Sequence, residues 1–282
     1  MNPLTFQVVI APLAEASLTG GNVLMAVVGR TRSGKSYAAM RLGELVSEVT
    51  KTPFDENNVV FTPKDFFNVL NKRLPRGSIL VFDEAGVGIP AKEWWSVSNR
   101  MVSTVAQTFG HMGYVVIFTM PHLGYIDKDV KHLFHYLVKT VRLRKREGKC
   151  RVRFLRLSVD PEKSNKIWKR RPVWFDGKGR HQVAFVDFTK PSEQLCLAYE
   201  KKAEKFKLGV LRYAEIAVDD VLRRTRGLHV DVNAIVDRVK AAGGKYYYSY
   251  QGRRVVNQAA IERDFNVGAR VGQRVKRLVE GK

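Results

Sequence analysis

The sequence predicts a three-layer α/β domain with a mostly parallel sheet, followed by a basic segment and a small helical module. Short apolar runs alternate with helix-like patterns through the first half of the chain, which is typical of strands buried between two helical layers. A loop with two glycines separates the first apolar run from the first helical pattern. Positive charge begins abruptly near the middle of the chain, so a domain boundary is expected there.

Four apolar runs have the character of buried parallel strands, because they are short, rich in branched side chains and bounded by Gly, Pro or charged residues. They span residues 23–28, 59–61, 79–82 and 115–118. Apolar residues at helical spacing predict helices between them, over residues 35–46, 64–70 and 92–109. Parallel strands joined by helices need crossover connections, and these are almost always right-handed.

Residues 29–36 match the phosphate-binding pattern G-x-x-x-x-G-K-[S/T], between a predicted strand and a predicted helix as that motif requires. The glycines allow backbone N–H groups to surround phosphates, and the helix N-terminus adds its positive dipole end. We expect Lys35 to reach the β- and γ-phosphates and Ser36 to ligate Mg²⁺. The expected nucleotide-binding residues are Gly29, Arg30, Thr31, Arg32, Ser33, Gly34, Lys35 and Ser36.

Asp83 and Glu84 follow the predicted strand 79–82, at the end where open α/β sheets bind ligands. Asp83 is expected to hold Mg²⁺ through water, and Glu84 to polarise the attacking water as a general base. The sequence therefore predicts a P-loop NTPase that uses ATP and Mg²⁺. A GTPase is a weaker alternative, because no N-K-x-D segment follows Asp83.

The two nucleotide motifs, together with residues 108–119, resemble the FtsK/HerA superfamily of ASCE-type P-loop ATPases. Within it, the chain looks most like Zot-like ATPases of filamentous phages and related ATPases of archaeal mobile elements. The resemblance covers about residues 20–145 and includes the segment 124–133 after the last predicted strand. It implies a DNA-translocating or DNA-packaging ATPase that acts as a ring, with a hexamer as the expected state.

Two departures from the family pattern concern catalysis. Thr119 occupies the family's γ-phosphate-sensing strand end, but Met120 follows it where the family often has Gln, and Gly110 stands where Arg is common. Three explanations fit these departures: Thr119 senses the γ-phosphate alone, hydrolysis is slow, or a neighbouring subunit supplies the missing donor. Ring ATPases place an arginine in the neighbour's site to stabilise transition-state charge, and Arg100 is the candidate.

The charge distribution points to an anionic partner. Residues 1–141 hold 14 Lys or Arg and 11 Asp or Glu, whereas residues 142–180 hold 15 and 4. Residues 136–146 and 149–158 alternate as a hairpin, so several cations should share one face and follow phosphates. DNA is the expected partner, duplex in the first instance, although the sequence leaves the strand form open. The expected contacts here are Arg142, Arg144, Arg151 and Arg153.

The last 50 or so residues predict a helical module of the winged-helix or helix-turn-helix kind. Asn257 is a suitable N-cap for one helix, and a final helix should carry Val271, Val275 and Leu278 inward. The opposite face of that helix would enter a DNA groove. Its expected contacts are Arg270, Arg274 and Arg277.

These patterns predict an ATPase core (residues 1–145), a basic hairpin with a helical extension (146–228) and a DNA-binding module (229–282). No apolar run reaches 18 residues, so a cytoplasmic protein without stable membrane insertion is expected, encoded by a virus, provirus or plasmid. An AAA+-type initiator and a non-motor, ATP-gated DNA-binding protein remain alternatives. The lack of a recognisable helical lid between residues 145 and 190 argues against the initiator.

Overall fold

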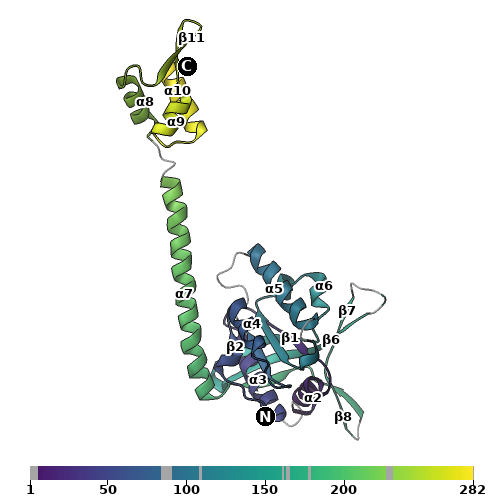
Figure 1. The fold of residues 1–282 in the computed structure, drawn as a ribbon. Coiled ribbons are helices and arrows are strands. Elements are labelled where there is room, and N and C mark those ends of the chain that lie inside the picture. The colour runs from purple at the N-terminus through teal and green to yellow at the C-terminus, as the bar shows by residue number, and fades with distance from the viewer. Residues whose placement is uncertain are drawn as a thin grey trace. The chain divides into compact units, whose positions relative to one another are not determined.

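The computed structural model describes residues 6–83, 91–107, 110–160, 162, 166–176, 179–226 and 231–281. The chain divides into two compact units, Met1–Leu211 and Arg212–Lys282. The long helix α7 (Glu193–Arg226) runs through the division between them (Figure 1). The expected boundaries at residues 145 and 228 stay predictions.

Within the described residues, the first unit contains an eight-stranded sheet of order β10-β6-β5-β1-β4-β3-β2, with β7 paired to β6. The pairs β1–β4, β1–β5, β3–β4 and β2–β3 are parallel, whereas β6 is antiparallel to β5, β7 and β10. Strands β8 and β9 form a separate antiparallel ribbon. The strands are Val23–Val28 (β1), Val59–Val60 (β2), Ile79–Phe82 (β3), Val115–Met120 (β4), Tyr136–Arg144 (β5), Lys149–Val159 (β6), Ile167–Arg170 (β7), Val173–Asp176 (β8), Gly179–Gln182 (β9) and Val186–Thr189 (β10).

Helices cover both faces of this sheet. The longer ones are α2 (Ala11–Thr19), α3 (Lys35–Thr50), α4 (Pro63–Asn71) and α5 (Ala91–Gln107). Shorter turns are η1 (Phe6–Ile10), η2 (Glu56–Asn58), η3 (Gly110–Met112), η4 (Leu123–Tyr125), α6 (Lys128–Lys131) and η5 (Lys145–Glu147).

The core consists of two apolar clusters, one on each face of the sheet. Met25 and Val27 of β1 pack with η1, α2, α3 and the start of α7, whereas Leu24 and Ala26 pack with α4 and α5. Successive side chains of a strand point to opposite faces, so a strand buried on both sides has no polar alternation. This is why β1, β3 and β4 read as continuous apolar runs. The mixed α/β fold with a mostly parallel sheet is confirmed.

Most of the expected elements are present, with small shifts of their ends. The strands 23–28 and 79–82 are found unchanged, and the strand predicted over residues 115–118 extends through Met120. Helix α4 begins where Thr62 accepts a hydrogen bond from the Asp65 N–H at 3.1 Å, with Pro63 in the first helical position, which is a favoured N-terminal arrangement. Residues 6–19 and strands β7–β10 are structured as well, although no sequence pattern predicted an element there.

The second unit has its own small core. Its elements after α7 are α8 (Val232–Ala241), β11 (Tyr247–Tyr250), β12 (Arg253–Val256), α9 (Gln258–Asp264) and α10 (Ala269–Glu280). Asn257 caps α9 by accepting from the Ala260 N–H at 3.1 Å, as predicted. Val275 is fully buried, but Leu278 is 41% exposed and Val279 packs inward instead. The prediction that Leu278 is a core residue is therefore wrong.

Across the described part of the chain, no helix combines the length and the apolar character needed to cross a membrane.

Candidate functional site

The loop 29–36 joins the carboxyl end of β1 to the N-terminus of α3. Gly34 directly precedes α3 with φ of 88°, a left-handed conformation that glycine adopts without steric cost. The Lys35 ammonium folds back over the loop and donates to the Arg30 carbonyl at 2.8 Å. The loop thus presents its lysine and the first turn of a 16-residue helix at one end of the sheet.

Strands β5 and β6 support this loop from behind. The Thr140 hydroxyl contacts the Ser33 hydroxyl at 2.7 Å and the Val28 carbonyl at 3.3 Å. The Cys150 thiol donates to the Ser33 carbonyl at 3.6 Å, and burial raises the pKa of that thiol to about 11. The thiol therefore stays protonated near neutral pH and serves as a donor to the loop.

The packing leaves no room for a side chain at Gly29 and little room at Gly34. A Cβ at Gly29 would lie 1.8 Å from the Thr140 Oγ1, and a Cβ at Gly34 would lie 3.1 Å from the Cys150 Sγ. From the sequence, these glycines were expected to serve phosphate binding alone. The structure adds that they allow β5 and β6 to approach the loop.

Asp83 stands at the carboxyl end of β3, with no exposed surface. Its Oδ1 accepts from the Thr119 hydroxyl at 2.6 Å, and its Oδ2 accepts from the Tyr199 hydroxyl at 2.6 Å. A buried carboxylate needs such donors to offset lost hydration. Thr119 and Asp83, both expected site residues, are thus brought together, and Tyr199 joins them although no sequence pattern assigned it a role in the site.

Tyr199 belongs to a contact that joins α7 to α3. Its ring lies 6.3 Å from the ring of Tyr37 in an edge-on arrangement, and the Tyr37 hydroxyl donates to Glu200. Burial, followed by the nearby Glu200 carboxylate, raises the pKa of Tyr37 above its ordinary value. Further along α3, Glu44 accepts the Ser192 N–H at 2.8 Å. The helix that carries the loop lysine is therefore tied to α7 and to the residue directly before it.

The remaining predicted catalytic residues are placed as follows. Glu84 lies outside the described residues. Met120 is buried in the cluster that faces α4 and α5, on the side of the sheet away from Tyr199. Arg100 is exposed on α5, and its predicted role between subunits stays a prediction.

The geometry fits a nucleoside triphosphate with Mg²⁺. The loop offers backbone N–H groups at a helix N-terminus, which attract phosphate. Lys35 and Ser36 open the helix, and the Asp83 carboxylate ends a neighbouring part of the same sheet. Oxygen donors of this kind suit Mg²⁺, which keeps several of its waters.

The cations predicted to bind DNA fall into two groups. On the β5–β6 pair, Arg142 lies opposite Arg151, while Arg153 lies opposite Lys139. Arg151 forms a bidentate ion pair with Asp187, both bonds measuring 2.8 Å, and Arg144 lies 3.2 Å from Glu147. Two of the four predicted arginines are thus already paired with carboxylates.

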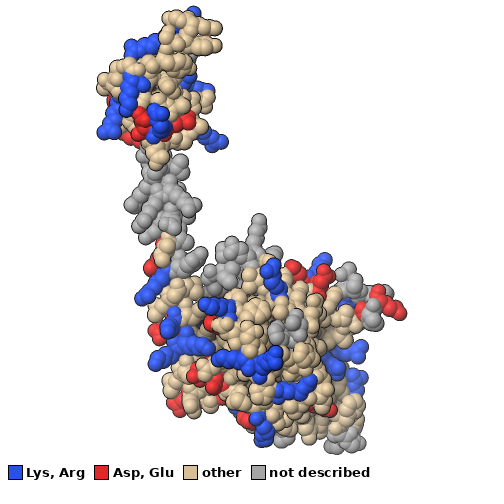
Figure 2. Space-filling view, in the orientation of Figure 1, with Lys and Arg blue, Asp and Glu red and all other residues tan. Residues whose placement is uncertain are grey.

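The second group lies on α10 of the second unit. Arg270, Arg274 and Arg277 are all exposed, on the side opposite the buried Gly272 and Val275. In the view of Figure 2, Lys and Arg side chains predominate over Asp and Glu on both units. The hairpin β11–β12 lies between α8 and α9 in the chain.

A comparison with known protein families matches one part of this chain. The family model described as Zonular occludens toxin (Zot) matches residues 44–166. The matched segment includes Asp83 and Thr119, but neither the loop 29–36 nor Tyr199. No curated protein matches the chain. Over residues 44–166, from α3 to the residues after β6, this chain is similar to the Zot family, which is related to P-loop ATPases.

Proposed function

We propose that this protein is an ATPase that couples ATP hydrolysis to the movement or packaging of DNA. The observation that carries the proposal is the buried triad of Thr119, Asp83 and Tyr199 at the sheet edge that also carries the phosphate-binding loop. A phosphate loop and a strand-end carboxylate are the two parts that ATP-hydrolysing P-loop proteins share. The similarity to Zot proteins supports the same class.

Each residue has a defined part in this mechanism. The loop N–H groups and Lys35 hold the phosphates, and turning the Lys35 ammonium from the Arg30 carbonyl to phosphate keeps it hydrogen-bonded. Ser36 and Asp83 would hold Mg²⁺, which neutralises charge on the β- and γ-phosphates when bound. Glu84, assigned from sequence, would orient the attacking water, and Thr119 would respond to the γ-phosphate through its bond to Asp83.

DNA would be held by the cations of both units. Arg142 and Arg153 share one face of the β5–β6 pair, and phosphate contacts of this kind supply affinity without reading sequence. In the second unit, α10 would act as the groove-entering helix of a winged-helix or helix-turn-helix module. A hexameric ring, with Arg100 acting on the neighbouring subunit, completes the proposal.

The deciding experiment is ATP hydrolysis by the purified chain with and without duplex DNA. We expect DNA to stimulate the wild type and Glu84→Gln to abolish hydrolysis while ATP still binds. Lys35→Ala should lose both, whereas Lys64→Ala, at an exposed site on α4, serves as the charge-matched control. Negligible hydrolysis by wild-type protein that binds ATP would refute the motor.

A second function is tested by the same experiment, namely an ATP-gated DNA-binding protein that is not a motor. It is favoured by the Tyr199 bond to Asp83, because Tyr199 lies on the helix that continues into the second unit. In that case ATP should change DNA affinity in Glu84→Gln as much as in wild type. The AAA+ initiator gains no support, since the described part of residues 149–189 forms strands β6–β10 instead of a helical lid.

A further inference from the structure

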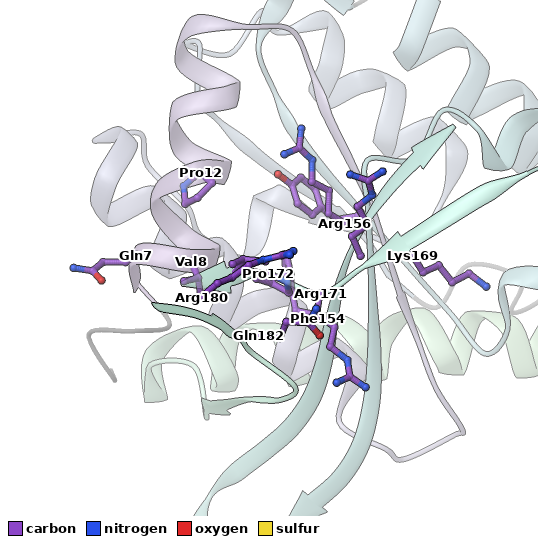
Figure 3. A pocket seen from close by; sticks show the side chains of 13 residues that line it. Gln7, Val8, Pro12, Phe154, Arg156, Lys169, Arg171, Pro172, Arg180 and Gln182 are labelled. Carbon is purple, nitrogen blue, oxygen red and sulfur yellow. The ribbon is translucent and has the colours of Figure 1, made fainter. Parts of the chain in front are cut away.

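A basic hollow lies on the first unit, away from the phosphate loop. It encloses about 700 Å³. Figure 3 shows Phe154 and Arg156 on one strand and Val8 and Pro12 on the N-terminal helical segment; Gln7 and Lys169 point outward. Its lining residues are Gln7, Val8, Pro12, Tyr136, Phe154, Arg156, Lys169, Arg170, Arg171, Pro172, Val173, Arg180 and Gln182.

The charge of this hollow is of one sign. Five of its lining residues are cationic, and none of the lining residues is Asp or Glu. Among the described side chains, none of these five cations is paired with a carboxylate. Cations gathered without counter-charges raise the local potential and attract an anion. The hollow is therefore suited to a ligand with several negative charges.

The hollow lies at the start of β5, whereas the phosphate loop contacts the middle of that strand. Tyr136, opposite Arg156, begins the strand and lines the hollow, whereas Thr140 supports Ser33 of the loop. These two positions are four residues apart, or about 13 Å along the strand. None of the residues 29–36 of the phosphate loop lines the hollow, so the two are separate sites.

Two exposed aromatic rings lie at the margins of the hollow, each on the same strand face as residues that line it. Phe175 is 70% exposed and lies directly opposite Arg180, while the next pair on the same face of the ribbon, Val173 and Gln182, lines the hollow. Trp168 is 44% exposed and precedes Arg170 by two residues on β7, so both point the same way. Lys166 covers the Trp168 ring at 4.0 Å. Figure 1 shows β7 and β8 at the margin of the unit.

Cations interleaved with exposed rings distinguish between the two forms of DNA. A duplex stacks its bases inside and offers mainly phosphates along its outside, so the rings would gain little. A single strand presents base faces that stack on aromatic side chains while its phosphates follow a positive groove. The volume of the hollow is that of a small-ligand site. This size suits a single strand better than a duplex.

We propose that this hollow, with Trp168 and Phe175 at its margins, binds single-stranded DNA. This rests on the proposed function in taking DNA as the substrate, and it changes the expected form from duplex to single strand at this site. The phosphates contact Arg156, Arg170 and Arg180, and bases stack on the two exposed rings. Sequence preference is weak, because stacking accepts any base.

The test measures binding of the full chain to a fluorescent oligothymidine and to a duplex of equal length, by anisotropy at several salt concentrations. The triple variant R156A/R170A/R180A should bind the single strand at least tenfold more weakly. Its salt slope should fall in magnitude by about 2, at roughly 0.7 for each phosphate that is no longer neutralised. The control is K64A/K201A/K205A, which removes the same charge from exposed positions on α4 and α7.

Phe175→Leu isolates stacking from charge. We expect it to weaken single-strand binding severalfold and to leave duplex binding unchanged. Three results would each overturn the inference. The triple variant and its control could lose single-strand affinity equally, or the triple variant could lose more affinity for duplex than for single strand. The third is that inorganic tripolyphosphate competes with the single strand while Phe175→Leu has no effect. If wild type binds neither DNA form, the proposed DNA motor fails too. If it binds duplex with DNA-stimulated hydrolysis in all variants, this inference alone fails.

Discussion

The Tyr199 hydroxyl donates a 2.6 Å hydrogen bond to Oδ2 of Asp83, across 116 residues of chain. Asp83 is the strand-end carboxylate of the candidate nucleotide site, and Tyr199 lies in the first part of α7. The ring of Tyr199 also packs against Phe61, at 5.9 Å between centroids. A change in the position of Asp83 would therefore be transmitted to the start of the helix that enters the second unit.

Tyr199→Phe should destabilise the protein while leaving its packing intact. The variant keeps the ring between Tyr37 and Phe61 but removes a donor from a carboxylate with no exposed surface. Losing a hydrogen bond to a charged group costs about 1.5–3 kcal/mol. Urea denaturation should show this loss. Tyr37→Phe, which removes a hydroxyl bonded to the exposed Glu200, should cost less, and equal costs would contradict the assignment.

The ATP affinity of the phosphate loop should depend on the hydroxyl of Thr140. Thr140→Val keeps the shape of the side chain but removes the contacts to the Ser33 hydroxyl and the Val28 carbonyl. A net loss of about 0.5–1.5 kcal/mol corresponds to an ATP affinity reduced by up to about tenfold. Titration with a fluorescent ATP analogue measures this. Thr140→Ser retains the hydroxyl and should bind nearly as wild type, and a similar loss in both variants would point to packing instead.

His135 should make stability depend on pH. Its Nδ1 accepts from the Leu24 N–H at 3.0 Å, so the ring must be neutral on that nitrogen. Burial, followed by the charge of Arg156, lowers the pKa of His135. The unfolded chain then binds a proton more readily than the folded one, so stability is full above the ordinary histidine pKa of about 6.5 and falls below it.

The measurement is the free energy of unfolding between pH 5 and 8, for wild type and His135→Asn. The asparagine oxygen can replace Nδ1 as the acceptor without titrating. We expect His135→Asn to remove a slope of up to about 1.4 kcal/mol per pH unit below a pH of about 6.5. An unchanged slope would assign the acid sensitivity to other groups.

Much of the fold follows from local patterns that tertiary contacts do not override. The strands around Met25 and Val81 are apolar on both faces because both faces are covered, and Asn257 caps its helix through neighbouring residues alone. Leu278 was misplaced because a short amphipathic helix accommodates a rotation of one position, which brings Val279 inward.

The site was predictable where a motif is continuous in sequence and not where distant segments meet. The loop 29–36 and Asp83 have signatures of their own. Tyr199 and Thr140 reach the site only through the pairing of distant elements, and a single sequence carries no signal for such contacts. The cations of the hollow on β6, β7 and β9 are likewise gathered by strand pairing, although their abundance was evident in the composition.

The ion pair between Arg151 and Asp187 should limit DNA binding on the β5–β6 face. The two bonds of 2.8 Å occupy the guanidinium, and the same contact lowers the pKa of Asp187, so the carboxylate stays charged at neutral pH. Asp187→Asn should release Arg151 for phosphate and strengthen duplex binding. The salt slope should steepen by up to about 0.9, the value for one further phosphate neutralised.

The control for this prediction is Glu204→Gln, which removes one negative charge from an exposed position on α7. A general effect of net charge would strengthen binding equally in both variants, whereas release of Arg151 is specific to Asp187→Asn. The double variant D187N/R151A should lose the gain, because the arginine that the substitution frees is then absent. If D187N/R151A binds DNA as tightly as Asp187→Asn, the face around Arg151 does not contact DNA.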